Sequence, residues 1–436
     1  MEIIMVSIWS KTSDLPRFEA LKGDLSVDAL IIGGGITGVL CAYMLEREGV
    51  DYALVEAGRI CGGATKNTTA KITFQHGLIY RKLIDRFGAE RARMYLDANA
   101  EALEEYRGLC GNIDCDFHEK DAYVYSLDDR RVLEDELAAL DKIGYKAEYT
   151  DKLPLPFPVA GAVRFKAQAE FDPLKFISSV SQNLNIYENT RVKELTERGA
   201  ITENGRISAK KIIVATHFPF INKHGSYFLK LYQSRSYALA LDNAPDVNGM
   251  YIDEAENGVS FRNHKNLLLI GGGGHRTGKR GGKWTELERL AAEYYPRSNI
   301  VCRWAAQDCM SLDGVPYIGM YSKRTPNFYV ATGYNKWGMT SSMAAAKLLA
   351  DMVVERENRF APVFSPSRSM LRPQLAVNAF EAVSNLLTIS GKRCPHMGCA
   401  LKWNPQEHSW DCPCHGSRFT RDGKLIDNPA TGDLNE

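Results

Sequence analysis

The chain has 436 residues, which is longer than a protein with a single hydrophobic core usually is. Its length therefore predicts two or three domains. Its 54 Lys and Arg residues almost balance its 53 Asp and Glu residues. This balance argues against nucleic acid or an anionic membrane as partner and favours a small molecule or a protein. We predict no membrane span, because no apolar run of about 18 residues occurs. The first 28 residues lack an export-signal pattern, which predicts a cytoplasmic protein.

The N-terminal part of the chain has the pattern of a strand, a glycine turn and a helix. Residues 28–32 form an apolar strand pattern, residues 39–48 form a helical pattern, and a second strand pattern covers residues 52–55. That second strand ends in Glu56. An acidic residue at this place can accept both ribose hydroxyls of an adenosine and repels a 2′-phosphate. The pattern therefore predicts a dinucleotide site that disfavours NADP.

Each glycine of the turn meets a separate requirement. Gly33 permits the tight turn, Gly35 lets a pyrophosphate approach the backbone, and Gly38 lets the helix pack closely on the strand. The N-terminus of the helix then attracts the phosphates. A glycine turn without a ligand is the alternative, but the fingerprint around it favours the ligand. We predict cofactor contacts from Gly33, Gly35, Ile36, Thr37, Gly38 and Glu56.

Three later segments favour FAD over NAD. The loop after Glu56 is rich in small and hydroxyl side chains, which suits an extended flavin dinucleotide; its predicted contacts are Ala57, Gly58, Thr65, Lys66, Thr68, Thr69 and Ala70. Buried strand patterns end in small polar turns near residues 215 and 332, and the second turn leads into a helix whose dipole suits an anionic flavin locus. His76 and His217 border these loops. The predicted contacts here are Val192, Ala215, Thr216, Gly333, Lys336, Trp337, Gly338, Met339 and Thr340.

Two stretches between these segments lack nucleotide-binding patterns. Residues 83–144 place apolar side chains at helical spacing in a charged background, which predicts a helical cover. Residues 227–270 contain alternating runs, which predict antiparallel strands. Asp172 followed by Pro173 predicts a helix start that returns the chain to the first domain.

Two short boxes near the C-terminus each combine one cysteine with one histidine. Cys394 and His396 form the first box, and Cys412 and His415 form the second. This is the ligand set of a Rieske iron–sulfur centre, in which two thiolates hold one iron and two imidazoles hold the other. Tetrahedral zinc is the alternative, but zinc sites typically pair two cysteines within one short spacing. The mixed boxes favour the iron–sulfur centre and hence electron transfer.

The segments that favour FAD resemble the D-amino-acid oxidase or glycine-oxidase superfamily of FAD-dependent oxidoreductases. The run Asp313-Gly-Val-Pro-Tyr-Ile-Gly319 matches the C-terminal pattern of that superfamily. With the two boxes included, the chain is similar to bacterial FAD-dependent oxidoreductases that carry a C-terminal Rieske domain. The resemblance implies that the glycine turn and Glu56 hold the adenosine diphosphate portion. It also implies that residues 65–71 lie along the pyrophosphate and flavin, and that residues 333–340 meet the isoalloxazine.

The Rieske segment resembles the respiratory type, and this adds expectations about the cluster. Cys399 and Cys414 match the positions of a disulfide that ties the two loops together. Ser417 matches a serine that donates a hydrogen bond to a cluster sulfur, whereas Phe419 stands where a tyrosine donates another. Hydrogen bonds to sulfur stabilise the reduced cluster, so we predict a redox potential below that of the respiratory type.

Together these patterns predict an α/β fold with an α+β substrate domain. The expected FAD-binding domain is Rossmann-like, of the D-amino-acid oxidase type, and discontinuous, with residues 25–82, 155–225 and 305–360. An antiparallel-sheet substrate or cap domain comprises residues 83–154 and 226–304. Residues 361–385 are expected to form a linker and residues 386–436 a small all-β Rieske cluster-binding segment. The base subdomain of a full Rieske domain is reduced here, so we expect this segment to lean on the flavoprotein body.

FAD and a 2Fe–2S cluster in one chain predict an oxidoreductase that converts two-electron into one-electron transfer. A flavin accepts a hydride and can release its electrons singly, and a Rieske cluster takes one electron at a time. We therefore expect a dehydrogenase, rather than an oxidase, that passes electrons to a protein or a quinone. The superfamily resemblance implies that it oxidises the C–N bond of a small amine or amino acid. A reductase running in the opposite direction and a non-enzymatic module with a structural metal staple are the alternatives. No catalytic residue is predicted.

Overall fold

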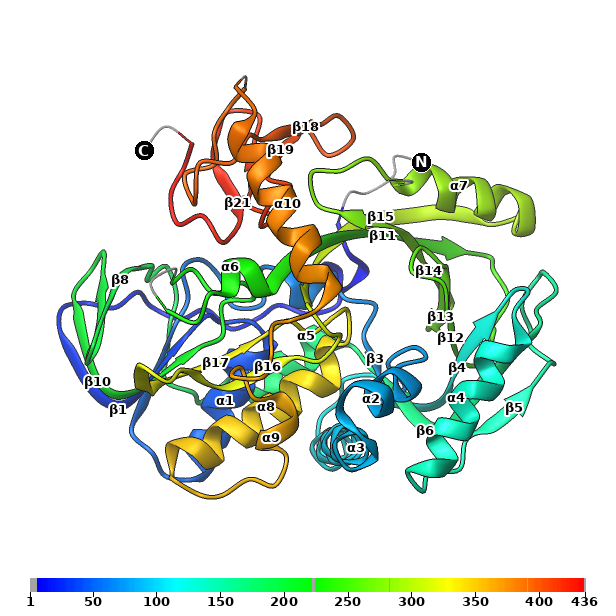
Figure 1. Cartoon of the computed structure of the whole chain (residues 1–436), viewed down its shortest axis with the longest axis horizontal. Helices are drawn as coiled ribbons and strands as arrows, with labels where there is room; N and C mark the ends of the chain where they lie inside the picture. Colours follow the sequence, from blue (N-terminus) through cyan, green and yellow to red (C-terminus); the bar gives the residue numbers. More distant parts are fainter. Residues whose placement is uncertain (1–5, 222–223, 282, 390, 435–436) are drawn as a thin grey trace.

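The computed structural model describes residues 6–221, 224–281, 283–389 and 391–434. Two large β-sheets with their helices form the body, and a small third sheet lies at the C-terminal end of the chain (Figure 1). Within the described residues, no helix is both long enough and apolar enough to cross a bilayer.

The first sheet is mostly parallel, and the helices that carry the predicted glycine and flavin segments pack on it. Strands β1, β2, β7, β10 and β17 run parallel, and β16 pairs with β17 in the antiparallel sense. The order is β16 (Tyr317–Ser322), β17 (Thr325–Thr332), β10 (Arg206–Val214), β1 (Leu25–Ile32), β2 (Tyr52–Val55) and β7 (Ile186–Tyr187), and β9 (Gly199–Thr202) and β8 (Val192–Thr196) extend from β10.

Strand β1 is buried on both faces. Ala29 and Ile31 belong to the apolar cluster on one face, and Leu30 and Ile32 belong to the cluster on the other. Side chains alternate between the two faces of a strand, so a continuous apolar run is what a sheet covered on both sides requires. Helices α1 (Ile36–Arg47) and α8 (Gly338–Val353) both contribute to the first of these clusters.

The second sheet is antiparallel except for the β12–β4 pair. Its order is β15 (Asn299–Ser311), β11 (Leu231–Asp242), β14 (Leu267–Arg276), β13 (Ser260–His264), β12 (Met250–Asp253), β4 (His118–Ser126), β6 (Gly161–Glu170) and β3 (Lys71–Ile72), and β5 (Glu148–Thr150) pairs with β6. The antiparallel strands predicted within residues 227–270 are therefore present.

The second sheet takes in strands that the sequence boundaries assign to the first domain. Strand β6 lies in the predicted FAD-binding range 155–225, yet it pairs with β4, β5 and β3 of the second sheet. Strand β4 likewise interrupts residues 83–144, which were expected to form a helical cover. The two strands pair with each other across about 40 residues of sequence, so local periodicity does not identify their sheet.

Two of the helices begin at a capping aspartate. Asp172 caps α5 (Pro173–Val180) by accepting hydrogen bonds from two backbone amides, and Asp129 caps α4 (Arg130–Lys142) in the same way. The other helical segments of the body are η1 (Ile8–Lys11), η2 (Ala64–Asn67), α2 (Tyr80–Phe87), α3 (Ala89–Cys110), α6 (Tyr227–Lys230), α7 (Lys283–Tyr294) and α9 (Ala361–Phe364).

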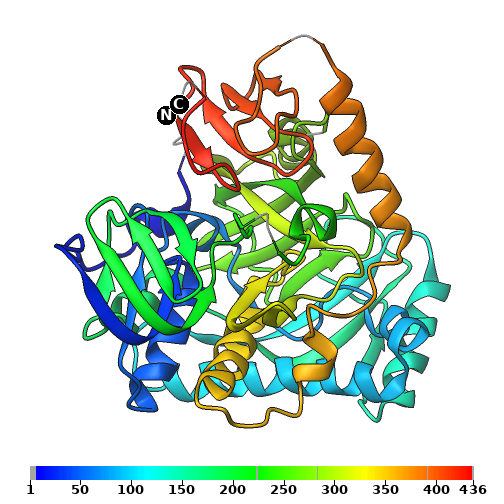
Figure 2. The same cartoon turned by 60° about the vertical axis from the view of Figure 1, so that its left-hand side comes forward.

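The C-terminal part consists of one helix and four short antiparallel strands. The strands are β18 (Lys402–Asn404), β19 (Ser409–Asp411), β20 (Arg418–Thr420) and β21 (Leu425–Asp427), in that order. The preceding helix, α10 (Pro373–Leu387), runs along the outer edge of the molecule (Figure 2). The segment 361–385, expected to be a linker, thus contains α9 and most of α10. Serine and proline near residue 366 mark a break between helices, and not an extended connection.

Candidate functional site

A cavity of about 910 Å³ is lined by both large sheets. All the predicted cofactor-contacting residues line it except Gly38, Ala70 and Thr340. The size suits a dinucleotide together with a small substrate. The segments predicted for a flavin, remote from one another in sequence, therefore meet at one site.

The glycine turn between β1 and α1 has the geometry that the sequence requires. Gly33 has φ +107°, and a Cβ atom there would lie 2.6 Å from the Ala215 carbonyl oxygen. A Cβ atom on Gly38 would lie 1.9 Å from the Gly33 carbonyl oxygen. Both positions exclude larger side chains, so Gly38 acts by keeping the turn tight, although it does not line the cavity.

Glu56 lies at the end of β2 against the same turn. Its Oε2 accepts a hydrogen bond from the Gly34 amide at 2.7 Å, and its Oε1 accepts one from the Gly58 amide at 2.8 Å. The carboxylate is thus fixed at the cavity wall, where an adenosine ribose would meet it in a dinucleotide-binding fold.

The remaining two residues outside the lining support loops. Thr340 Oγ1 donates to the Thr73 carbonyl oxygen at 3.0 Å, and the Ala70 carbonyl oxygen accepts from Arg262 at 2.8 Å. Of the two histidines that border the flavin loops, His217 lines the cavity, whereas His76 is buried beside it and bonds to Tyr95.

Lys71 lines the cavity as a buried amine. Its Nζ donates to Thr69 Oγ1 at 3.1 Å and lies 3.4 Å from Ser260 Oγ. Burial and the neighbouring Arg262 lower the pKa of Lys71 to about 7, although Glu170 opposes this shift. An amine of this kind can accept a proton near neutral pH.

Several lining residues come from segments that the sequence did not assign to the site. Arg235 and Tyr237 lie on β11, Asp308 lies on β15, and Asp427 and Asn428 lie at the end of the Rieske segment. No sequence motif marks these residues, and only the contacts between remote segments bring them to the cavity. The C-terminal segment forms part of the cavity wall.

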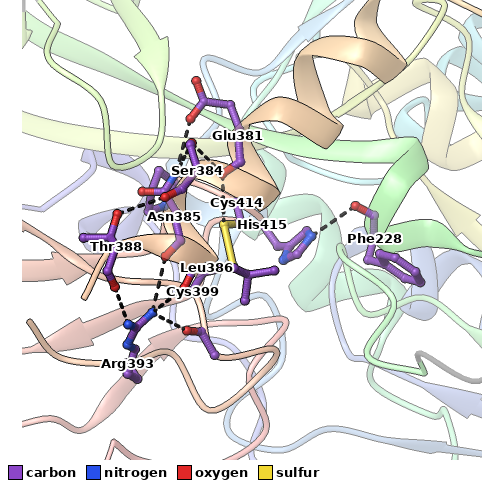
Figure 3. The surroundings of a disulfide bond; sticks show 12 residues. Phe228, Glu381, Ser384, Asn385, Leu386, Thr388, Arg393, Cys399, Cys414 and His415 are labelled. Carbon is purple, nitrogen blue, oxygen red and sulfur yellow. Dashed lines mark hydrogen bonds between the residues drawn. A yellow bond between two sulfur atoms is a disulfide. The ribbon is translucent and has the colours of Figure 1, made fainter. Parts of the chain in front are cut away.

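The four predicted metal ligands lie close together in the C-terminal segment. The rings of His396 and His415 are 4.9 Å apart and nearly perpendicular, and the Cys394 and Cys412 thiols contact each other. The contact with Cys412, together with a hydrogen bond from Ser417, lowers the pKa of Cys394 to about 7 although burial opposes this. Cys399 and Cys414 form a disulfide between the two loops, in agreement with the expectation (Figure 3).

His415 is oriented as a metal ligand requires. Its Nε2 lies 3.1 Å from the Phe228 carbonyl oxygen, an acceptor, so Nε2 carries the proton. Its Nδ1 is buried and has no hydrogen-bond partner. A buried imidazole nitrogen left as an acceptor fits an iron ligand whose tautomer is fixed by a carbonyl on the other side of the ring. The donor set fits a Rieske cluster.

The body holds the second box through its main chain. Arg276 donates to the carbonyl oxygens of Pro413 and Cys414 at 3.0 and 3.1 Å. Gln233 donates to the His415 carbonyl oxygen at 3.1 Å, and Gln307 donates to that of Gly416 at 2.9 Å. Every carbonyl oxygen from residue 413 to residue 416 is therefore bonded to the flavoprotein body, as expected for a segment with a reduced base.

A buried ion network strengthens the same contact. Glu407 pairs with Arg235 of β11 and with Arg418 of β20, and Arg418 also binds Asp411 at 3.0 Å. Burial opposes ionisation of Glu407, but the two arginines outweigh it and lower the pKa of Glu407 to about 2. Because Arg235 also lines the cavity, this network joins the cavity wall to the cluster segment.

A parallel glycine-turn sheet, an antiparallel second sheet and a two-Cys, two-His centre define a flavoprotein oxidoreductase with an iron–sulfur segment. The FAD dependent oxidoreductase (DAO) family matches residues 28–352, and the Rieske 2Fe–2S domain family matches residues 367–436. The chain belongs to the FAD-dependent oxidoreductase family and carries a C-terminal Rieske domain, so FAD and a 2Fe–2S cluster are its cofactors.

Relatives agree with this assignment. The chain is 35% identical to YhfW of Bacillus subtilis (strain 168), described as a Rieske 2Fe-2S iron-sulfur protein, over 98% of this chain and 96% of that protein. It is 24% identical to gamma-glutamylputrescine oxidoreductase of Escherichia coli (strain K12), over 83% and 93% of the two chains. Glycine oxidase from Geobacillus kaustophilus shares the fold, with a TM-score of 0.66 and 20% identity. The match covers 79% of this chain and 100% of that chain.

Proposed function

We propose that the protein is a dehydrogenase that oxidises a C–N bond of a small amine or amino acid and passes the electrons singly through its cluster to an acceptor. When bound, the flavin accepts a hydride and the cluster accepts one electron. The amine class is supported by the E. coli relative, whose name gives gamma-glutamylputrescine as its substrate. The predicted cofactor contacts, from Gly33 to Met339, form the flavin site in this proposal.

One turn carries the proposal, because it touches the cavity on one side and the cluster ligands on the other. Thr216 and His217 line the cavity. The next residue, Phe218, has its ring 6.0 Å from the ring of His415 and 6.4 Å from that of His396. Three consecutive residues thus span the space between the flavin cavity and the imidazole ligands.

The Rieske segment is fixed to this turn from the other direction. Asn428 Nδ2 donates to the carbonyl oxygens of Thr216 and Phe218, at 2.5 and 3.0 Å. His415 is 3% exposed, and its Nε2 is hydrogen-bonded to the carbonyl oxygen of Phe228 in the flavoprotein body. The imidazole edge of the cluster therefore faces the flavoprotein, which favours electron entry from the flavin at this edge.

Lys71 is the proposed proton acceptor. An amine substrate arrives mainly as an ammonium ion, and hydride transfer from carbon requires the neutral amine. The proton can pass from the substrate nitrogen to the neutral Lys71 Nζ, after which loss of a hydride from the adjacent carbon leaves the protonated imine. Thr69 and Ser260 hold this Nζ at the cavity wall. A lysine with a lowered pKa in a cleft is a candidate catalytic base.

Anaerobic addition of amines and amino acids tests the proposal. A true substrate bleaches the flavin absorbance and then produces the electron spin resonance signal of the reduced cluster. Bleaching without cluster reduction contradicts the proposed direction of electron flow. Reduction of the cluster by an external donor, followed by flavin reduction, instead supports the reverse, reductase reading.

A further inference from the structure

Helix α10 presents an apolar face to solvent. In the described part of the chain, eight of the thirteen exposed large apolar side chains lie within residues 371–397. Phe380 is 70% exposed, Leu387 73% and Ile389 97%. The eight are Leu371, Val377, Phe380, Val383, Leu386, Leu387, Ile389 and Met397. Such a concentration marks an interaction surface, because single exposed apolar residues are normally scattered.

The orientation of α10 is fixed by polar contacts on its inner side. Asn378 is buried, its Nδ2 donates to the Leu229 carbonyl oxygen at 3.1 Å, and its Oδ1 accepts from Arg276 at 2.9 Å. At the end of the helix, Arg393 donates to carbonyl oxygens of Asn385 and Leu386 (Figure 3). The helix therefore points its asparagine side chains inward and its apolar stripe outward. A rotation that buried the stripe would break these hydrogen bonds.

The segment that carries the stripe has a positive net charge. Residues 371–402 contain four basic side chains, Arg372, Lys392, Arg393 and Lys402, against one acidic residue, Glu381. Glu381 is itself paired with Lys279 at 2.7 Å. The near-zero charge of the whole chain thus conceals a local basic excess beside the apolar stripe. An apolar stripe flanked by cations is the arrangement that binds an anionic lipid surface.

We propose that the outer face of α10 docks on an anionic membrane surface. Phe380, Val383 and Leu387 enter the interfacial region, and Lys392 and Lys402, which are both exposed, meet lipid phosphates. The peripheral contact adds to the catalytic activity and does not depend on the direction of electron flow.

Two other occupants fit the surface less well. A second copy of the chain in a two-fold dimer would bring the same basic residues close to their equivalents, with repulsion across the contact. A transient electron carrier forms a small interface, and so extensive an apolar stripe is typical of lasting contacts. An anionic bilayer satisfies both the apolar area and the charge.

The cluster lies directly behind this face. Cys414 Sγ is 3.8 Å from the carbonyl oxygen of Glu381 in α10, and a Cβ atom on Gly398 would lie 3.8 Å from Leu386. Docking through α10 therefore brings the disulfide side of the cluster toward the bilayer, on the opposite side from the imidazole edge that faces the body.

Co-sedimentation of the full-length holoprotein with vesicles tests the proposal. Vesicles of one part phosphatidylglycerol to two parts phosphatidylcholine should bind the protein, and pure phosphatidylcholine should bind it about tenfold less. The Phe380→Ser/Leu387→Ser variant should lose about tenfold or more in binding to the anionic vesicles. Leu127→Ser is the matched control, because Leu127 is 52% exposed and lies after β4, outside the α10 face.

The outcomes are distinguishable. Loss of binding in the Phe380→Ser/Leu387→Ser variant alone, with unchanged flavin and iron content, supports the proposal. Failure of the wild-type protein to bind anionic vesicles overturns it, and so does an equal loss in Leu127→Ser. If light scattering shows a wild-type dimer that the double substitution dissociates, a second copy covers the face and the membrane proposal is wrong.

Discussion

Gln233 Nε2 donates a hydrogen bond to the main-chain oxygen of His415 at 3.1 Å, so a strand of the second sheet holds the loop that carries a predicted cluster ligand. The same amide reaches the Asn428 carbonyl oxygen at 3.0 Å, and Gln233 Oε1 accepts from His217 at the cavity wall. One buried side chain thus connects the cavity, the second box and the last turn of the Rieske segment.

Replacement of Gln233 by Leu should weaken this connection. Two buried carbonyl oxygens lose their donor, which costs about 1–3 kcal/mol for each group left unsatisfied. We expect a lower melting temperature and slower cluster reduction after flavin reduction, measured by calorimetry and rapid-freeze electron spin resonance. Gln406→Leu is the control, because the side chain of Gln406 is exposed on the Rieske segment. Equal effects in the two variants would contradict the role of Gln233.

Substitutions of Ser417 and Phe419 should shift the redox potential of the cluster in opposite directions. Ser417 is fully buried and its hydroxyl contacts Cys394, whereas Phe419 is buried and offers no donor. Ser417→Ala removes a hydrogen bond to sulfur and should lower the midpoint potential. Phe419→Tyr should raise it if the phenol reaches the ligand cysteine. A hydrogen bond of about 1 kcal/mol corresponds to roughly 40 mV for one electron. Redox titration checks both values, and a rise in Ser417→Ala would refute the tuning argument.

Flavin reduction by substrate should depend on the protonation of Lys71. The pKa of Lys71 is lowered to about 7, so the neutral form prevails above that pH. The rate of anaerobic flavin reduction should therefore rise with pH through about 7. Lys71→Met should abolish this limb of the profile, and Lys71→Arg, which stays charged, should be slow at every pH. A wild-type limb that survives in Lys71→Met would assign the ionisation to another group.

Acid should loosen the Rieske segment through Glu407. Its folded-state pKa is lowered to about 2, below the ordinary value near 4.5, so its stabilisation is complete above about pH 4.5 and is lost as the pH falls toward 2. Glu407→Gln leaves two buried arginines without this partner and should cost about 3–5 kcal/mol. Thermal unfolding between pH 7 and pH 3 measures both effects. The variant should show a flatter acid dependence than the wild type, and an unchanged slope would exclude Glu407 as the source.

Local motifs in the sequence predict the cofactor segments and the metal ligands, because each motif consists of neighbouring residues, and the structure brings these residues together. The Gly33 turn, the Cys394 and Cys412 boxes and the Asp172 cap are of this kind, and the disulfide follows from resemblance. The placement of β6 and the helical nature of residues 373–387 were not predicted. Strand β6 is defined by its pairing with β4, and α10 exposes its apolar side, so hydrophobic periodicity gives no guide to how it packs. The contribution of Arg235 and Asn428 to the cavity likewise depends on contacts between remote segments.

The connection between the flavin cavity and the cluster is tested most directly by the kinetics of cluster reduction. The flavin of the holoprotein is reduced anaerobically within the mixing time, and the reduced-cluster signal is followed at several protein concentrations. Transfer through the turn at Thr216–Phe218 predicts a first-order rate that does not change with protein concentration. A rate proportional to protein concentration, or a cluster that stays oxidised beside a reduced flavin, would contradict transfer within one chain.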